Sequence, residues 1–365
     1  MSSYTPFVEV RRGHLSEVRI VDRPHPPLGD GQARLSIESF ALTANNVTYA
    51  AMGDPMRYWD FFPTDEPGWG RVPVWGFATV VESHSDAALI GERVYGYFPM
   101  GAELVVLPGR ADPTGFTDLA AHRQPMAAVY NRYVRVSDTP DPEADTLRML
   151  LHPLFVTGFL IADAIADHDE AAGGPAPTGV VVSSASSKTA LALAWSARRL
   201  GVTTVGLTSA TRHATVDALG AWDEVLGYDE ARRLAEYPGR WVFVDIAGNA
   251  EVARQVHTVL GEALVRSITV GITHWDQLAI RGSEPPGVAR EMFFAPARIV
   301  KRQADWGRGG LDARMGEQWE AFAAWARTWL DVRRVHGAEA LALLWRQLVD
   351  GIDDPRRGYV GSLAE

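Results

Sequence analysis

Short β-prone runs separated by turn residues make up the chain as far as about residue 142. Apolar and polar positions alternate along residues 33–38, as they do on a strand with one buried face. Runs rich in β-branched and aromatic residues, close to glycine or proline, recur at 76–82, 93–97 and 104–107. Short strands punctuated in this way predict a β-barrel or sandwich domain.

From residue 179 the pattern changes to strands that alternate with helices. Residues 179–183 form an apolar run suited to a strand buried on both faces. Residues 188–200 repeat apolar positions at helical spacing, and Gly201 follows as a stop signal. Further elements continue the alternation: a strand at 202–208, a helix at 211–219, a strand at 241–245, a helix through Val252, Val256 and Leu260, and a strand at 264–270. This order predicts a parallel sheet built of βαβ units.

The last part, from about residue 281, has the pattern of a loop rich in proline and arginine followed by two amphipathic helices. Their apolar faces carry Trp319, Phe322, Ala326, Trp329 and Leu330 in one helix and Leu341, Leu344, Trp345 and Leu348 in the other. Together the three patterns divide the chain into residues 1–142, 143–300 and 301–365.

Composition narrows the possible partners. The chain has 365 residues, about the length of two domains, and 47% of them are hydrophobic and 22% charged, as in a folded globular protein. The formal net charge is −10 and no long basic stretch opposes it, so we expect neither a nucleic-acid nor an anionic-membrane partner. The chain has no cysteine, which excludes disulfides, thiolate catalysis and thiolate-bound zinc. We expect no metal site, because ligand-like spacing is lacking among His84, His122, His152 and His168.

Two segments bear on location. The most apolar stretch, residues 149–162, is too short to span a bilayer and contains His152 and Pro153. The first eight residues lack the basic and then apolar pattern of a signal peptide. We therefore expect a soluble, cytoplasmic protein.

The turn after the strand at 179–183 is the strongest candidate for a ligand site. Its small residues leave backbone N–H groups exposed beside the positive end of a helix, which suits a pyrophosphate. The usual glycines are missing, but serine hydroxyls and a lysine add donors. The alternative is a capped helix with a surface lysine. The candidate cofactor-binding residues of this turn are Ser184, Ser186, Ser187, Lys188 and Thr189.

The end of the second parallel strand distinguishes between cofactors. An NAD site normally places an acidic residue there for the adenosine ribose hydroxyls. Here the sequence offers Thr208, Ser209, Thr211 and Arg212, with no carboxylate between Thr204 and His213. Hydroxyls and a cation favour a 2′-phosphate and therefore NADP(H). Alternatively, Ser209 or Thr211 caps a helix and Arg212 is solvated.

Several segments, in order and spacing, resemble the medium-chain dehydrogenase/reductase superfamily, in its zinc-free branch of quinone oxidoreductases and enoyl reductases. Residues 44–53 look like the family segment in which an Asn and a Tyr approach the nicotinamide, and residues 91–96 are close to its G-D-R-V-x-G turn. Other similar segments are 180–201 (strand, A-S-G-G-V-G loop and helix), 219–228 (L-G-A-D-x-V-I-x-Y), 244–248 (V-x-D-x-x-G), 270–271 and 358–360.

The resemblance implies an α/β fold with a Rossmann doubly wound parallel sheet at 143–300 and a GroES-like β-barrel catalytic domain at 1–142. Residues 301–365 would supply helices and a strand that returns to the catalytic domain. It also implies NADP(H) as the cofactor. We further expect a homodimer. The catalytic candidates are Tyr49 and Asn46, with the alternative that Tyr49 only packs on the nicotinamide. The family positions add Arg212, Tyr228, Gly248 and Gly271 to the cofactor site.

These features predict an NADP(H)-dependent, zinc-independent oxidoreductase that transfers hydride to or from a small apolar enone, quinone or enoyl-type substrate. The alternatives are an NADP(H)-binding sensor or scaffold without turnover, and a relative that has lost the nucleotide. Two departures from the family are the missing glutamate of P-G-x-E-x-x-G at 73–79 and an insertion around 292–302. Aromatic residues after Tyr49 indicate a hydrophobic substrate, with Tyr58, Trp59 and Phe61 as lid candidates and Trp75 and Phe77 assigned to the barrel core.

Overall fold

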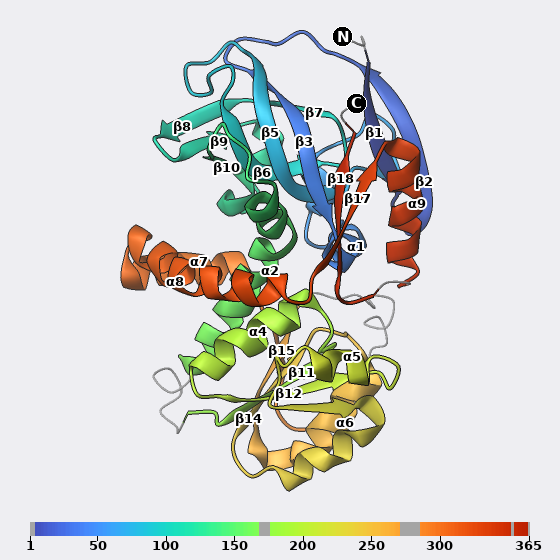
Figure 1. Ribbon diagram of the computed structural model, residues 1–365, viewed down its shortest axis with the longest axis vertical. Coiled ribbons are helices and arrows are strands. Elements are labelled where there is room, and N and C mark those ends of the chain that lie inside the picture. Colours follow the sequence, from blue (N-terminus) through green and yellow to red (C-terminus); the bar gives the residue numbers. More distant parts are fainter. Residues whose placement is uncertain (1–3, 168–175, 271–284, 352–353, 364–365) are drawn as a thin grey trace. The chain divides into compact units, whose positions relative to one another are not determined.

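The computed structural model describes residues 4–167, 176–270, 285–351 and 354–363 (Figure 1). The chain forms two compact units, one of Met1–Leu150 with Leu330–Glu365 and one of Leu151–Trp329. The chain passes from one unit to the other at residues 150/151 and 329/330, whereas the sequence pattern divides the chain at 142/143 and 300/301.

The first unit is β-rich. Its small sheet has the order β2-β1-β4, with β1 Tyr4–Arg11, β2 His14–Pro24 and β4 Trp69–Gly70. Its large sheet has the order β17-β18-β3-β5-β6-β10-β9-β8, and β7 also pairs with β3. The bounds are β3 Ala33–Leu42, β5 Pro73–Ser83, β6 Arg93–Pro99, β7 Glu103–Val106, β8 Pro108–Asp112, β9 Gly115–Asp118, β10 Arg132–Arg135, β17 Asp331–His336 and β18 Arg357–Ser362. Helices α1 Ala44–Ala51 and α9 Ala338–Val349 belong to this unit, with single turns η1 Tyr58–Phe61, η2 Ala121–Arg123 and η3 Ala128–Asn131.

The predicted strands of this unit lie inside longer or shifted ones. Along β3, Leu35 and Ile37 are buried while Ser36 is partly exposed, as alternation requires. The β18 strand, which follows all the helices, pairs antiparallel with β3 through Tyr359, Val360 and Gly361. A strand near the C-terminus therefore pairs with a strand from the N-terminal part of the chain in one sheet.

The second unit contains one wholly parallel sheet of order β13-β12-β11-β14-β15-β16. Its strands are β11 Gly179–Ser183, β12 Thr203–Thr208, β13 Glu224–Gly227, β14 Trp241–Asp245, β15 Leu264–Thr269 and β16 Arg290–Met292. Its helices are most of α2 Pro142–Ala166, then α4 Lys188–Arg199, α5 His213–Ala218, α6 Ala250–Leu260, α7 Ala295–Trp306 and α8 Arg308–Arg327, with η4 Tyr228–Glu236 and η5 Gly261–Ala263.

Helices cover both faces of this sheet. Val180 and Val182 face a core that includes residues of α2 and α4, whereas Val181 faces a core shared with α6. This double burial explains why the β11 sequence is apolar without alternation. Chain order reverses between β11 and β14, which makes that pair the topological switch point of a doubly wound sheet. The predicted α/β fold is confirmed.

The apolar stretch at 149–162 belongs to α2, which is 25 residues long. The helix is longer than the apolar stretch because polar residues from Pro142 onward extend it towards the N-terminus. Among the described residues it is the one helix long and apolar enough to cross a membrane, yet 67% of its most apolar window is buried inside the protein. Such burial is typical of a core helix in a soluble protein.

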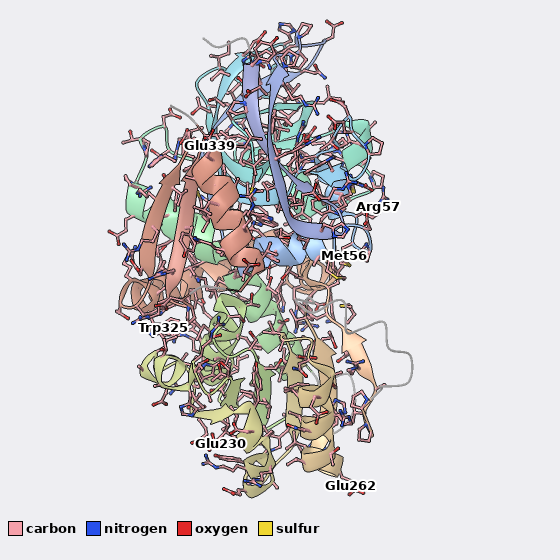
Figure 2. All side chains as sticks on the ribbon, turned by 90° about the vertical axis from the view of Figure 1, so that its right-hand side faces the viewer. Met56, Arg57, Glu230, Glu262, Trp325 and Glu339 are labelled. Carbon is pink, nitrogen blue, oxygen red and sulfur yellow. The ribbon has the colours of Figure 1, made fainter. Side chains whose placement is uncertain are left out.

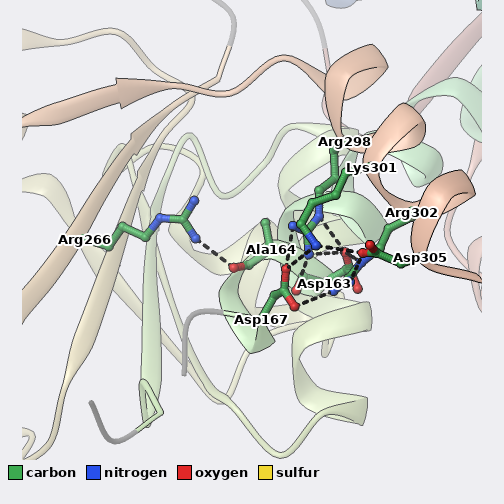
Figure 3. Close-up of polar contacts among 8 residues, drawn as sticks. All are labelled: Asp163, Ala164, Asp167, Arg266, Arg298, Lys301, Arg302 and Asp305. Atoms are coloured by element: carbon green, nitrogen blue, oxygen red, sulfur yellow. Dashed lines mark hydrogen bonds and ion pairs between the residues drawn. The ribbon is translucent and has the colours of Figure 1, made fainter. Parts of the chain in front are cut away.

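Helix α7 was not predicted, because proline and arginine after residue 281 resembled a loop. Pro296 sits in its first turn, where proline is tolerated. Figure 3 shows how α7 is held: Arg298 and Arg302 contact Asp163 of α2, and together with Lys301 they contact Asp167, which directly follows α2. Arg298 Nε lies 2.7 Å from Asp163 Oδ2, and Arg302 Nη2 lies 2.9 Å from Asp167 Oδ1. The insertion thus forms a charge-paired helix against α2.

Candidate functional site

The turn between β11 and α4 has a defined, partly strained backbone. Ser184 has a φ of 57°, in the left-handed region that favours glycine. Its N–H donates to the hydroxyl of Tyr228 at 3.1 Å, and its carbonyl accepts from Ser187 N–H at 2.8 Å. Ser187 caps α4, because its Oγ accepts from the N–H of Ala190 at 3.2 Å. The capped-helix interpretation is therefore correct for Ser187, and a cap is compatible with anion binding.

Lys188 and Thr189 begin helix α4 directly after this cap. Lys188 therefore adds a positive side chain to the positive end of the helix dipole. Ser186 is buried and accepts a hydrogen bond from Arg212 Nη1 at 3.3 Å. The structure thus brings Arg212, predicted from the second strand, onto the loop predicted from the first.

The end of β12 presents further hydroxyls beside Arg212. Thr208 is buried at the strand end, and Ser209 Oγ lies 3.1 Å from Thr211 Oγ1. The N-cap position of α5 is Arg212 itself, and no side-chain cap forms there among the described residues. The interpretation of Ser209 or Thr211 as the cap of this helix is therefore wrong.

A buried network under the loop was missed from the sequence. Ser183 Oγ donates to Asp245 Oδ1 at 2.7 Å and accepts from the N–H groups of Ile246 and Ala247 at 2.9 and 3.0 Å. Gly248, with a φ of 67°, donates its N–H to the same Oδ1 at 2.9 Å. The network joins the carboxyl ends of β11 and β14. The signal in the sequence is an aspartate that ends an apolar strand.

Burial raises the pKa values of two groups in this region. It raises the pKa of Asp245 above its ordinary value, against the opposing effects of Ser183 and of backbone N–H groups. Burial also raises the pKa of Tyr228, so this phenol stays protonated near neutral pH. Gly271, the remaining candidate of the cofactor site, lies outside the described residues.

In the β-rich unit, Asn46 holds the start of helix α1. Its Oδ1 accepts from the N–H of Thr43 at 2.8 Å, completing a capping box. Its Nδ2 donates to the carbonyl of Pro73 at 2.9 Å, which ties α1 to β5. Both polar ends of Asn46 are therefore engaged in positioning the helix that carries Tyr49.

Tyr49 is buried on α1 within a group of aromatic rings. The indole N–H of Trp75 donates to its hydroxyl at 3.4 Å, and burial raises the pKa of this phenol. The ring centroid of Tyr58 lies 4.7 Å away and that of Tyr97 5.7 Å away. Tyr49 is therefore a protonated phenol, a hydrogen-bond donor rather than a base.

The aromatic residues after Tyr49 have different roles. Trp59 is buried against the backbone of Gly53 and Gly70, where added Cβ atoms would lie 2.0 and 2.3 Å from its ring. Trp59 is therefore a core residue, and its assignment as a lid is wrong. Its turn η1 follows Arg57, which is labelled in Figure 2. Arg57 has a φ of 60°.

Tyr58 and Phe61 from the same turn are also buried, and they stack with each other at a centroid distance of 6.3 Å. They line the Tyr49 cluster rather than an exposed loop. Phe77 is fully buried, as the core prediction requires. Trp75, also assigned to the core, is instead half-buried and touches Tyr49.

Within the described ranges, no group of three or more His, Asp or Glu side chains is placed to hold a metal ion. The side chains that the structure places at the two candidate sites are the phenols of Tyr49 and Tyr228, serine and threonine hydroxyls, Lys188, Arg212 and the buried carboxylate of Asp245.

Comparison with known proteins gives the following. Residues 40–353 match the family described as "Protein of unknown function (DUF2855)". No curated protein sequence matches the chain. Three solved structures share the fold. CurA from Vibrio vulnificus in complex with NADPH has 12% sequence identity and a TM-score of 0.64, and the match covers 95% of this chain and 94% of that chain. The CurK enoyl reductase has 15% identity and a TM-score of 0.60, with 99% of both chains covered, and the quinone oxidoreductase from Coxiella burnetii has 14% identity and a TM-score of 0.55, with 99% of this chain and 100% of that chain covered.

These similarities extend over nearly the whole chain. They confirm the predicted architecture of a parallel α/β sheet joined to a β-rich unit. At this low sequence identity, the similarities show only that the architecture is shared.

Proposed function

The chain belongs to the DUF2855 family, and we propose that it is an NADP(H)-dependent, zinc-independent oxidoreductase. Its substrate would be a small apolar enone, quinone or enoyl-type compound. The observation that carries the proposal is the contact between Arg212 and Ser186, which joins a cation at the end of β12 to the turn after β11. This is the place where a doubly wound sheet binds the phosphates of a dinucleotide.

The donor set fits a phosphate-rich cofactor. Arg212 offers a planar guanidinium to a 2′-phosphate, with Ser209 and Thr211 adding hydroxyls. Lys188 and Ser187 at the start of α4 are the candidates for the pyrophosphate. The hydroxyl oxygen of Tyr228 accepts a hydrogen bond from Ser184 N–H, so this backbone donor is used within the protein. The O–H of Tyr228 can donate to the cofactor instead. The relative CurA was solved with NADPH, which agrees with this choice of cofactor.

The cofactor, when bound, supplies or accepts a hydride. The protein must then stabilise charge on the substrate oxygen. Tyr49 fits this role because its pKa is raised and its oxygen already accepts from Trp75, so the phenolic proton can be donated. Asn46 acts through α1 as a positioning residue.

The aromatic rings around Tyr49 support an apolar substrate. Tyr58, Tyr97 and Trp75 pack around the phenol and make its surroundings apolar. Aromatic side chains usually line small-molecule sites. Two of the named structural relatives are a quinone oxidoreductase and an enoyl reductase. We extend the proposal to a homodimer located in the cytoplasm.

The alternative is an NADP(H)-binding sensor or scaffold without turnover. It draws support from the side chains that replace the family glycines at Ser187 and Lys188. A turnover assay separates the two: the protein is given NADPH and, in turn, a quinone, an α,β-unsaturated ketone and a saturated ketone. Oxidation of NADPH that depends on one of the first two supports the enzyme. Tight NADPH binding without oxidation of NADPH in any assay supports the scaffold.

A further inference from the structure

Arg148 is a cation beside the aromatic cluster that holds Tyr49. It lies in the first part of α2, within the β-rich unit, and the residue is half-buried. Its guanidinium carbon lies 4.4 Å from the ring centroid of Tyr95, which is 4% exposed. The hydroxyl of Tyr95 in turn donates to the carbonyl of Arg148 at 3.4 Å. The ring and the start of the helix therefore fix the position of this guanidinium.

A row of rings connects this cation to the proposed proton donor. Tyr95 on β6 is stacked on Trp75 of β5, with a centroid distance of 5.5 Å and an interplanar angle of 18°. Trp75 donates its indole N–H to the hydroxyl of Tyr49 at 3.4 Å. The row thus runs from Tyr49 through Trp75 and Tyr95 to Arg148. Its two half-buried members, Trp75 and Arg148, are accessible from solvent, whereas Tyr49 and Tyr95 are buried.

The charge of Arg148 is not compensated within the described part of the chain. Its guanidinium forms no hydrogen bond or ion pair with another described residue. One turn earlier on the same helix, Asp145 binds Arg93 Nη2 at 2.9 Å instead. Arg93 is also paired with Glu38 at 2.8 Å, so its own charge is neutralised. Arg148 is therefore an accessible positive charge whose N–H groups are available to a ligand.

The chemistry of this cation indicates which ligand group fits. A guanidinium can stack on an aromatic face and still offer its in-plane N–H groups in pairs to a carboxylate. A single uncompensated charge matches a carboxylate, whereas a phosphate monoester carries nearly two negative charges. The neighbouring Arg93 is already paired twice and adds no second free charge. One carboxylate is therefore the group that Arg148 suits best.

We propose that Arg148 binds a carboxylate carried by the substrate, so that the substrate is an apolar enone, quinone or enoyl-type compound with an anionic end. The inference rests on the proposed function, because it takes Tyr49 as the group that meets the substrate oxygen. It deepens that function by giving the substrate two fixed points, the oxygen at Tyr49 and the carboxylate at Arg148. Arg148 is then a specificity-determining residue of this site.

The test compares carboxylic acids with their own methyl esters. The substrates are α,β-unsaturated ketones that end in a carboxylate, with chains of increasing length between the alkene and the carboxylate, and the methyl ester of each. Acid and ester differ in charge and little else, so the ratio of their kcat/KM values with NADPH isolates recognition of the carboxylate.

Two variants are compared with the parent protein. Arg148→Met keeps an apolar side chain beside Tyr95 and removes the charge. Arg110→Met is the matched control, since it removes a charge from an exposed position of the same unit.

For at least one chain length, the parent protein should favour the acid over its ester roughly ten- to a hundredfold, as for a charge-assisted contact. In Arg148→Met the ratio should fall to about one, and in Arg110→Met it should stay as in the parent. A general loss of folded protein lowers the rates for acid and ester together and does not change the ratio. The proposal is overturned if the parent favours none of the acids, or if Arg148→Met keeps the preference.

Arg148→Lys covers the case in which Arg148→Met does not fold. It keeps the charge but not the paired N–H groups, so its preference for the acid should be weaker than that of the parent. An unchanged preference in this variant contradicts the proposed contact. Equal use of acids and esters by the parent overturns this inference alone and leaves the oxidoreductase intact. If the parent oxidises NADPH with neither acids nor esters, the proposed function fails and this inference falls with it.

Discussion

The indole N–H of Trp75 donates a hydrogen bond to the hydroxyl oxygen of Tyr49 at 3.4 Å. The contact connects β5 to helix α1 and orients the phenol, whose pKa is raised by burial. In the proposed mechanism Tyr49 uses its proton to stabilise the substrate oxygen.

Tyr49→Phe tests this role. It removes the hydroxyl but keeps the ring, so turnover should fall roughly a hundredfold, as for the loss of one oxyanion donor. NADPH affinity should be unchanged. Trp75→Phe is the companion variant. Its turnover should fall less than that of Tyr49→Phe, because Trp75 orients the phenol and does not donate to the substrate. An unchanged rate and Michaelis constant in Tyr49→Phe would remove Tyr49 from the mechanism.

The close packing around Trp59 predicts a stability effect far from the chemistry. In Gly53→Ala the new Cβ would lie 2.0 Å from Trp59 Nε1, so the core must shift. We expect a loss of about 1–3 kcal/mol in the free energy of unfolding, as for other overpacked cores. Gly316→Ala on α8 is the control, because its Cβ meets no atom within 4 Å and alanine favours a helix. If Gly53→Ala proved as stable as the parent in urea, Trp59 would not be the tight core residue described above.

The charge cluster between α2 and α7 predicts a pH dependence of stability. Hydrogen bonds and ion pairs with Arg298 and Arg302 lower the pKa of Asp167 from 3.8 to about 2, against the effect of burial. A lowered folded-state pKa gives stability that is present above about pH 4 and is lost as the pH falls towards 2.

Arg302→Met should therefore destabilise the protein at neutral pH, by roughly 3 kcal/mol for a broken buried pair, and reduce its loss of stability between pH 4 and 2. Urea unfolding of both proteins at several pH values measures this. The cluster would have no such role if the two proteins lost stability in parallel over that range.

The sequence predicted best those elements whose burial is uniform. The bounds of β11 and β14 agree with the predicted ones because both strands are apolar throughout and buried on both faces. The strand β2 escaped notice because it is mostly exposed and carries alternating charges without an apolar face. Helix α7 was missed because Pro296 and its arginines indicate a loop until their partners on α2 are known.

The same limit applies to the candidate site. The loop residues and Arg212 could be identified because each follows a strand end in the sequence. Their contact through Ser186 depends on the parallel pairing of β11 with β12. Trp59 was misassigned because the glycines that enclose it, Gly53 and Gly70, are recognisable only in three dimensions. The network of Ser183 and Asp245 was missed because it depends on the pairing of β11 with β14.

The most direct test of the account is a fluorescence titration of the protein with NADPH and with NADH, repeated for Arg212→Ala. The parent protein should bind NADPH more tightly than NADH. Loss of the guanidinium should weaken NADPH roughly ten- to a hundredfold, the cost of a charge-assisted hydrogen bond, and leave NADH nearly unchanged. Equal binding of the two cofactors, or a preference for NADH, would contradict the assignment, and binding of neither would reduce the parallel sheet to a scaffold without a nucleotide.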